Sequence, residues 1–96
     1  MDININDLYN ILSKSLLTKG ILLENLSVKE FGETFYIEVF CSKKNIIMKL
    51  FNPKIEYSHI QNSLKKSLNS YEVDYFDNFD NYFVFEVKFK KVSLSL

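Results

Sequence analysis

Strict alternation of side-chain types in two segments constrains the fold of this chain more than any other feature. One parity is apolar in both segments, namely Phe35, Ile37, Val39 and Cys41 in residues 34–41 and Phe83, Phe85, Val87 and Phe89 in residues 82–91. Because successive side chains of a β-strand point to opposite faces, each segment is predicted to be a strand with one apolar face. Two such strands need a sheet that other elements cover on one side.

Helical spacing of apolar residues marks the elements predicted to cover that sheet. Residues 5–18 carry apolar side chains three or four positions apart, with Asn4 as N-cap and Gly20 placed to end the helix. A second helix is predicted over residues 53–69. Its start is an Asn-Pro pair at residues 52–53, which combines a good N-cap with a proline at the first helical position.

Three further strands, over residues 21–31, 46–51 and 71–76, complete the predicted order α-β-β-β-α-β-β. Strands in runs, rather than strict alternation of strand and helix, favour an α+β fold. We predict a mostly antiparallel sheet of about five strands with two helices packed on one face. No linker composition, low-complexity segment or repeat interrupts the chain, so residues 1–96 are predicted to form a single compact domain.

The composition points to a source and a compartment. All twelve basic residues are Lys, and Arg, Ala and Trp do not occur, whereas Lys, Asn, Ile, Phe and Tyr are abundant. Codons of the abundant types are rich in A and T, so we expect a gene from a low-GC bacterium or from its phages or plasmids. The single Cys cannot form an intramolecular disulfide, and the chain has neither a signal-peptide pattern nor an apolar run that could span a bilayer. We therefore expect a cytoplasmic protein that is not associated with a membrane.

A formal net charge of zero conceals segregated charge along the chain. Residues 41–69 carry six Lys against one Glu, whereas residues 70–86 carry five acids and no Lys. Such blocks are typical of a solvated surface with local ion pairs. They are also typical of a bipolar surface that steers a charged partner, and the sequence leaves both interpretations open.

A lysine patch is the basis of one functional hypothesis, a nucleic-acid-binding accessory factor. Its residues would be Lys43, Lys44, Lys65 and Lys66. The order of elements over residues 5–69 resembles that of double-stranded-RNA-binding domains, which implies contact with RNA. The basic cluster with which those domains begin their second helix is reduced here to Lys54 beside Glu56. Because bidentate recognition of phosphate or guanine needs Arg, this function is the alternative rather than the leading prediction.

Candidate catalytic and metal-binding groups are few. Cys41 and His59 are the first choice for a thiolate–imidazole pair, but the inward parity of Cys41 and the helical position of His59 favour structural roles. Three acids spaced by three residues, Asp74, Asp77 and Asp80, could bind a divalent cation but lack an EF-hand pattern and favour turn formation. Only two Gly are present, so a glycine-rich phosphate loop is excluded. We predict no enzyme activity, no cofactor and no metal.

Protein binding is the leading functional prediction, because aromatic side chains lie on the outer parity of strand 34–41 and mix with acids in the last hairpin. The predicted partner-binding residues are Tyr36, Phe40, Phe76, Asp77, Phe79, Asp80 and Tyr82. The complete order of elements resembles the core of secretion-effector chaperones, small homodimers that bind unfolded segments of partner proteins. The chain is predicted to act stoichiometrically, as an inhibitor, adaptor or chaperone, in the manner of anti-CRISPR and immunity proteins of similar size.

The C-terminal segment supplies a prediction about self-association. Apolar side chains change parity after Lys90, from odd positions to Val92, Leu94 and Leu96. A shift by one residue exchanges the faces of a strand, so a bulge is predicted at Lys90 and Lys91. The three apolar residues either pack against a second subunit in a homodimer or belong to a frayed terminus.

Overall fold

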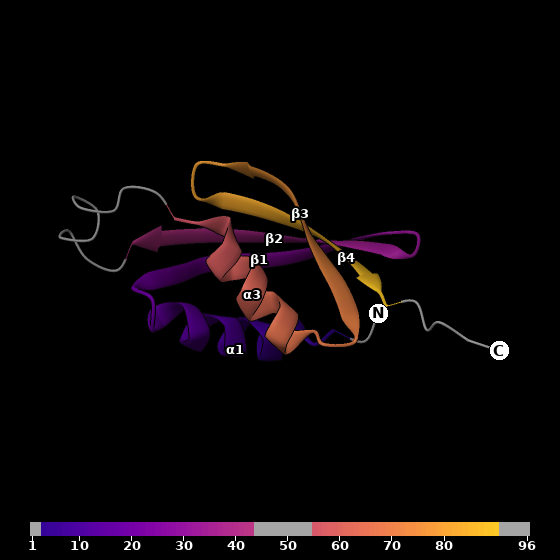
Figure 1. The fold of residues 1–96 in the computed structure, drawn as a ribbon, viewed down its shortest axis with the longest axis horizontal. Helices are drawn as coiled ribbons and strands as arrows, with labels where there is room; N and C mark the ends of the chain where they lie inside the picture. The colour runs from indigo at the N-terminus through magenta and orange to yellow at the C-terminus, as the bar shows by residue number, and fades with distance from the viewer. Residues whose placement is uncertain (1–2, 44–54, 91–96) are drawn as a thin grey trace.

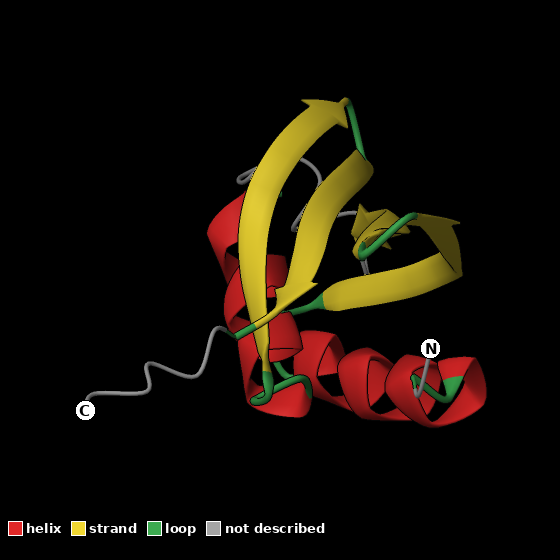
Figure 2. Cartoon of the chain, turned by 90° about the vertical axis from the view of Figure 1, so that its right-hand side faces the viewer, coloured by secondary structure: helices red, strands yellow, loops and turns green. Residues whose placement is uncertain are grey.

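The computed structural model describes residues 3–43 and 55–90, which form one four-stranded antiparallel sheet and two helices (Figure 1). The elements are α1 (Ile5–Leu17), β1 (Ile21–Phe31), β2 (Thr34–Lys43), α3 (Tyr57–Ser67), β3 (Tyr71–Phe79) and β4 (Tyr82–Phe89). The strands lie side by side in the order β1-β2-β4-β3. Both helices pack on one face of the sheet, the covered face (Figure 2). We call the opposite side the open face.

The α+β class, with two helices and an antiparallel sheet, is confirmed. The predicted order and the number of about five strands are wrong for the described residues, which contain four strands in the order α-β-β-α-β-β. The predicted strand 46–51 and the helix start at residues 52–53 lie outside the described residues. β2 pairs directly with β4, so that Ile37 lies opposite Phe85 and the apolar faces of the two alternating strands become continuous.

Local signals in the sequence set the ends of α1. The Asn4 side-chain oxygen accepts a hydrogen bond from the backbone N–H of Asp7 at 3.1 Å, as expected of an N-cap. Gly20 follows the helix with a φ of 73°, a left-handed conformation that glycine adopts without steric cost. Both predicted signals are confirmed. α3 begins at Tyr57, later in the chain than predicted.

The hydrophobic core fills the space between the two helices and the covered face. Its fully enclosed members, each 0% exposed, are Leu12, Leu16, Ile37, Val39, Cys41, Ile60, Leu64, Phe85 and Val87. Each large apolar side chain buried in this way stabilises the fold by about 1.5–3 kcal/mol. The inward parity predicted for β2 and β4 is confirmed, except that Phe89, at the end of β4, is 53% exposed.

Side chains of both helices also hydrogen-bond to the two edge strands. On β1, the carbonyl of Leu23 accepts the Tyr9 hydroxyl at 3.0 Å. On β3, the carbonyl of Val73 accepts Nε2 of Gln61 at 2.9 Å. These bonds fix each helix to one edge of the sheet and occupy backbone acceptors that could otherwise pair with another strand.

A β-bulge in β3 decides which side chains reach the open face. The register with β4 steps from Tyr75 opposite Phe85 to Asp77 opposite Val84, so Phe76 is the extra residue. A bulge of this kind places two residues of one strand against one residue of its partner.

The bulge exchanges the two faces of β3. Before it, Val73 faces the core and is 2% exposed. Beyond it, Phe79 lies opposite Tyr82, whose neighbour Phe83 faces the core, so Phe79 lies on the open face. In a regular strand Phe79 would share the inward face with Val73, because side chains alternate with a period of two.

The last hairpin is also tighter than predicted. β3 continues past residue 76 to Phe79, and the loop predicted over residues 77–81 is a two-residue turn at Asp80 and Asn81. Asp80 has a φ of 53°. Asp tolerates this left-handed conformation better than most residues, which suits it to a two-residue hairpin turn.

Candidate functional site

The open face of the sheet brings together most of the side chains predicted to bind a partner. They are Tyr36 and Phe40 of β2, Phe76, Asp77 and Phe79 of β3, and Tyr82 of β4. Asp80 lies in the turn of the same hairpin. Residues far apart in the chain thus share one surface, because β2 and β4 are neighbours and the bulge turns the end of β3 outward. Their role in binding stays a prediction.

Three rings form an aromatic row across the open face: Phe31, Tyr36 and Phe76. The ring centroids of Phe31 and Tyr36 are 5.6 Å apart and those of Tyr36 and Phe76 are 5.1 Å apart, both in edge-to-face contact. Phe31 is 63% exposed and Phe76 is 56% exposed. Single exposed apolar side chains are common on proteins, whereas these rings touch one another and form an apolar patch.

A second aromatic group lies toward the turn of the last hairpin. Tyr82 is the cross-strand partner of Phe40 on one side and of Phe79 on the other. Phe40 and Phe79 are both exposed, Phe79 the more so. The open face therefore carries rings at two places along its strands.

A hydrogen-bond network around Glu38 separates the two groups of rings. The Glu38 carboxylate accepts the Tyr82 hydroxyl and the Ser27 hydroxyl, the latter at 2.8 Å, and lies 3.2 Å from Nζ of Lys29. The bond from Tyr82 is the main reason that the pKa of Glu38 lies below its ordinary value of 4.5. The same bond raises the pKa of Tyr82 to about 12. The network fixes the Tyr82 side chain on the open face.

A second carboxylate, that of Glu86, supports the aromatic row. It accepts the Tyr36 hydroxyl at 3.3 Å and lies 3.0 Å from Nζ of Lys88. The bond to Glu86 raises the pKa of Lys88. Asp74 is the cross-strand partner of Glu86, which places two acids opposite each other beside the aromatic row. The charge of Lys88 acts on Asp74 as well as on Glu86, so one lysine lies close to both acids.

The acidic block predicted from the sequence lies on β3, β4 and the turn between them. Glu72, Asp74, Asp77 and Asp80 are all exposed, and residues 70–86 contain no Lys. Two lysines of the described residues, Lys29 opposite Tyr36 and Lys88 of β4, each lie within 3.2 Å of a carboxylate. The open face therefore combines exposed rings with an excess of negative charge.

Cys41 and His59 occupy different environments. Cys41 is 0% exposed, and burial, followed by the charge of Glu24, raises the pKa of its thiol to about 12. His59 is exposed on α3, where its Nδ1 lies 3.5 Å from Nζ of Lys19. A buried thiol with so high a pKa is protonated at neutral pH, which favours the structural role expected for Cys41.

The three regularly spaced acids are parts of a strand and a turn. Asp74 and Asp77 belong to β3, on either side of the bulge, and Asp80 lies in the turn. One carboxylate oxygen of Asp77 accepts the N–H of Asn78 at 2.8 Å, a local bond typical of Asp. Within residues 3–43 and 55–90 no group of three or more His, Cys, Asp or Glu is arranged to hold a metal ion.

The lysines of the nucleic-acid hypothesis do not form a patch in the part of the chain that the structure describes. Lys43 is only 7% exposed, at the end of β2, whereas Lys65 and Lys66 are exposed in the last turn of α3. In Figure 1 β2 ends at the left of the sheet, whereas α3 ends lower down, near the middle of the view. Lys44 lies outside the described residues.

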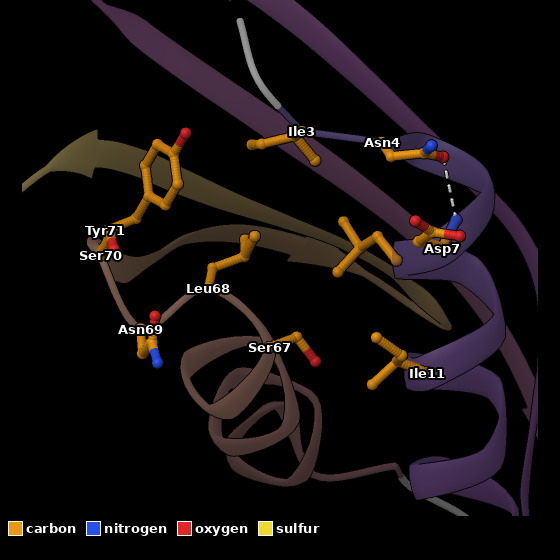
Figure 3. Close-up of a pocket in the computed structure, with 10 residues that line it drawn as sticks. Ile3, Asn4, Asp7, Ile11, Ser67, Leu68, Asn69, Ser70 and Tyr71 are labelled. Atoms are coloured by element: carbon orange, nitrogen blue, oxygen red, sulfur yellow. Dashed lines mark hydrogen bonds between the residues drawn. The ribbon is translucent and has the colours of Figure 1, made fainter.

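A cavity of about 270 Å³ lies between the start of α1 and the end of α3 (Figure 3). Apolar Ile3, Ile11 and Leu68 line it together with polar residues, two of which make hydrogen bonds within the protein. Asn4 caps α1, and the Ser67 hydroxyl donates to the carbonyl of Ser63 at 3.0 Å. The cavity thus presents polar and apolar surface in similar amounts.

Two members of the candidate surface were missed in the sequence, Phe31 and Glu86. Phe31 is the last residue of β1, and the outward parity of that strand was the available signal. Glu86 was visible as an outward position of residues 82–91, but only the structure brings it to Tyr36. The residues of the self-association prediction, Val92, Leu94 and Leu96, lie outside the described residues, as does Lys91 of the predicted bulge.

Comparisons of this chain with protein-family models, with curated proteins and with solved structures found no match. Neither of the described helices is both long and apolar enough to cross a membrane.

Proposed function

We propose that this protein is a non-enzymatic binding module that contacts another protein through the open face of its sheet. It acts stoichiometrically in the cytoplasm, as an inhibitor, adaptor or chaperone. The observation that carries the proposal is the aromatic row, in which Phe31 and Phe76 keep more than half of their surface exposed while in edge-to-face contact with Tyr36.

The arrangement of the row suits a partner-binding surface. Aromatic anchors provide much of the binding energy of protein interfaces, and their contribution is greatest when the rings are already held in place. Here the hydroxyls of Tyr36 and Tyr82 are bonded to Glu86 and Glu38, so both side chains are positioned before a partner arrives. A rigid ring loses little conformational freedom on binding, which favours affinity.

The decisive experiment is affinity capture from the native cell with three tagged forms: the wild type, the double variant Tyr36→Ala/Phe76→Ala, and the control Ile11→Ala. Ile11 is 53% exposed, close to the 56% of Phe76, but lies on α1 beside the cavity of Figure 3. We expect one protein to be retained by the wild type and the control, and its yield to fall at least about tenfold with the double variant.

The captured protein is then purified and titrated with each form by calorimetry. A fixed molar ratio and a weakened Kd for the double variant alone would support stoichiometric binding through the open face. Equal retention by all three forms, or loss with Ile11→Ala alone, would contradict the proposal.

A further inference from the structure

The chemistry of the open face also indicates what kind of partner it fits. Beside the aromatic row, Asp74 lies directly opposite Glu86, and Asp77 follows on the same face. Lys88 lies 3.0 Å from Glu86 and its charge also acts on Asp74, while Glu72 and Asp77 add further negative charge on the same face. A positive charge brought to this place by a partner would compensate the excess of negative charge that remains beside Lys88.

The rings of the row offer a second attraction for the same kind of group. The face of an aromatic ring attracts Lys or Arg, and the interaction strengthens when the cation is removed from water. Phe76 touches Tyr36 with its ring at 71° to the tyrosine ring and remains 56% exposed, so its surface is accessible beside Asp74 and Asp77. Rings and carboxylates together form a site for an extended, positively charged side chain.

We propose that the open face binds a basic segment of a partner protein, whose Lys or Arg side chains lie over Tyr36 and Phe76 and reach Asp74 and Asp77. This inference rests on the proposed function and specifies the chemistry of the partner. An electrostatically complementary partner is also drawn to the acidic hairpin from a distance, which accelerates association at low salt.

Two other occupants fit the surface less well. A nucleic acid would bring its phosphates against Glu72, Asp74 and Asp77, where like charges repel. A second copy of the chain in a two-fold contact would present the same patch to itself and so would bring these acids together. Charge complementarity therefore favours a basic protein segment.

The test uses three synthetic dodecapeptides built of Arg-Gly-Leu, Gln-Gly-Leu or Glu-Gly-Leu repeats, titrated into the isotope-labelled protein and followed by NMR. We expect the Arg peptide alone to shift the amide signals of Tyr36, Asp74, Phe76 and Glu86. Its Kd should weaken about fivefold in Asp74→Asn/Asp77→Asn and about tenfold in Tyr36→Ala/Phe76→Ala. Added salt should weaken the binding further.

The matched control is Asp7→Asn/Glu56→Gln, which removes one acid from the first turn of α1 and the acid at the N-cap of α3 instead. Both residues are exposed, and Glu56 makes no side-chain capping bond to α3. In the acidic variant on the open face, the Asp77→Asn substitution keeps a side-chain carbonyl oxygen that can accept the N–H of Asn78, so the strand should be preserved. We expect the control to bind the Arg peptide as the wild type does.

The outcomes separate this inference from the proposed function. Equal binding of the Gln or Glu peptide, shifts confined to the helices, or no shifts at all would overturn the basic-partner inference. Capture of a protein through Tyr36 and Phe76 would still support the proposed function in each of those cases. A captured partner whose binding is unaffected by Asp74→Asn/Asp77→Asn would likewise reject the inference alone.

Discussion

The covered and open faces of this sheet are built from the same strands but differ in what completes them. On β2, Ile37 and Val39 are 0% exposed beneath the helices, whereas Phe40, the next residue, is 47% exposed on the other side. The covered face is completed within the chain by α1 and α3, and no described helix or strand lies over the open face. Truncating a large side chain on the covered face should therefore lower stability. Truncating one of similar size on the open face should weaken binding instead.

The largest difference is expected between Phe85→Ala and Phe76→Ala. Phe85 is 0% exposed in the core, so its truncation should lower the free energy of unfolding by about 3–5 kcal/mol through lost burial and a residual cavity. Phe76 is 56% exposed, and its truncation should change the same free energy by less than about 1 kcal/mol. Urea denaturation of both variants measures the contrast.

Similar losses for the two variants would show that the open face also contributes to the core. In that case the rings of the aromatic row would stabilise the fold, and the open face could not be assigned to binding alone. The unfolding slopes of both variants should equal that of the wild type, since they report the surface exposed on unfolding.

A smaller effect is expected from the polar network of the open face. Glu38→Gln keeps the shape of the side chain but removes the charge that accepts the hydroxyls of Tyr82 and Ser27, so it should cost about 1 kcal/mol near neutral pH. Glu56→Gln is the control, because Glu56 makes no side-chain capping bond.

The pH dependence of stability provides a second measurement on Glu38→Gln. The pKa of Glu38 lies below 4.5 in the folded protein. Between the folded pKa and the ordinary value of 4.5, the folded state therefore binds fewer protons than the unfolded state. The stability that Glu38 contributes is therefore complete above about pH 4.5 and is lost as the pH falls through the folded pKa. The curve for Glu38→Gln should be flatter there, and parallel curves would refute the role of the network.

The covered face could be predicted from the sequence because its signals are local. Alternation from Phe35 to Cys41 and from Phe83 to Val87 is a strand pattern with one buried side, and all seven residues are buried. Asn4 and Gly20 likewise mark the ends of α1 through capping and a left-handed φ. These features depend on neighbours in the chain and not on the tertiary fold.

The open face could be predicted only in part, because its geometry depends on the pairing of distant strands. Tyr36 and Phe40 were recognisable from their parity, but the segment from Val73 to Phe79 has no regular alternation and conceals the bulge. The contact of Tyr36 with Phe76 requires β2 beside β4, and Phe79 reaches the open face only because of the bulge in β3. Neither condition leaves a local pattern in the sequence.

A gain of stability is expected at the turn between β3 and β4, which touches neither face. Asp80 has a φ of 53°, which glycine adopts without steric cost, so Asp80→Gly should stabilise the fold by roughly 0.5–1 kcal/mol in urea denaturation. The control is Glu33→Gly in the β1–β2 turn, where Gly32 already holds the left-handed position with a φ of 64°. That substitution adds only flexibility to the unfolded chain and should be neutral or destabilising. A loss of stability in Asp80→Gly would mean that its side chain supports the turn.

The smallest change in stability is expected from deletion of Phe76, although it removes a ring that is central to the proposed binding surface. Tyr75 lies opposite Phe85 and Asp77 lies opposite Val84, so the deletion joins two residues that already occupy consecutive positions of the ladder. The regular strand that results keeps Asp77 on the open face, and stability should change by no more than about 0.5 kcal/mol. NMR contacts between Asp77 and Val84 would verify the register, and binding of the Arg-Gly-Leu peptide should weaken about as much as in Phe76→Ala. A large loss of stability would show that the fold depends on the bulge. Binding as tight as that of the wild type would show that Phe76 is not part of the binding site. The deletion therefore tests the structural role of the bulge and the binding role of Phe76 separately.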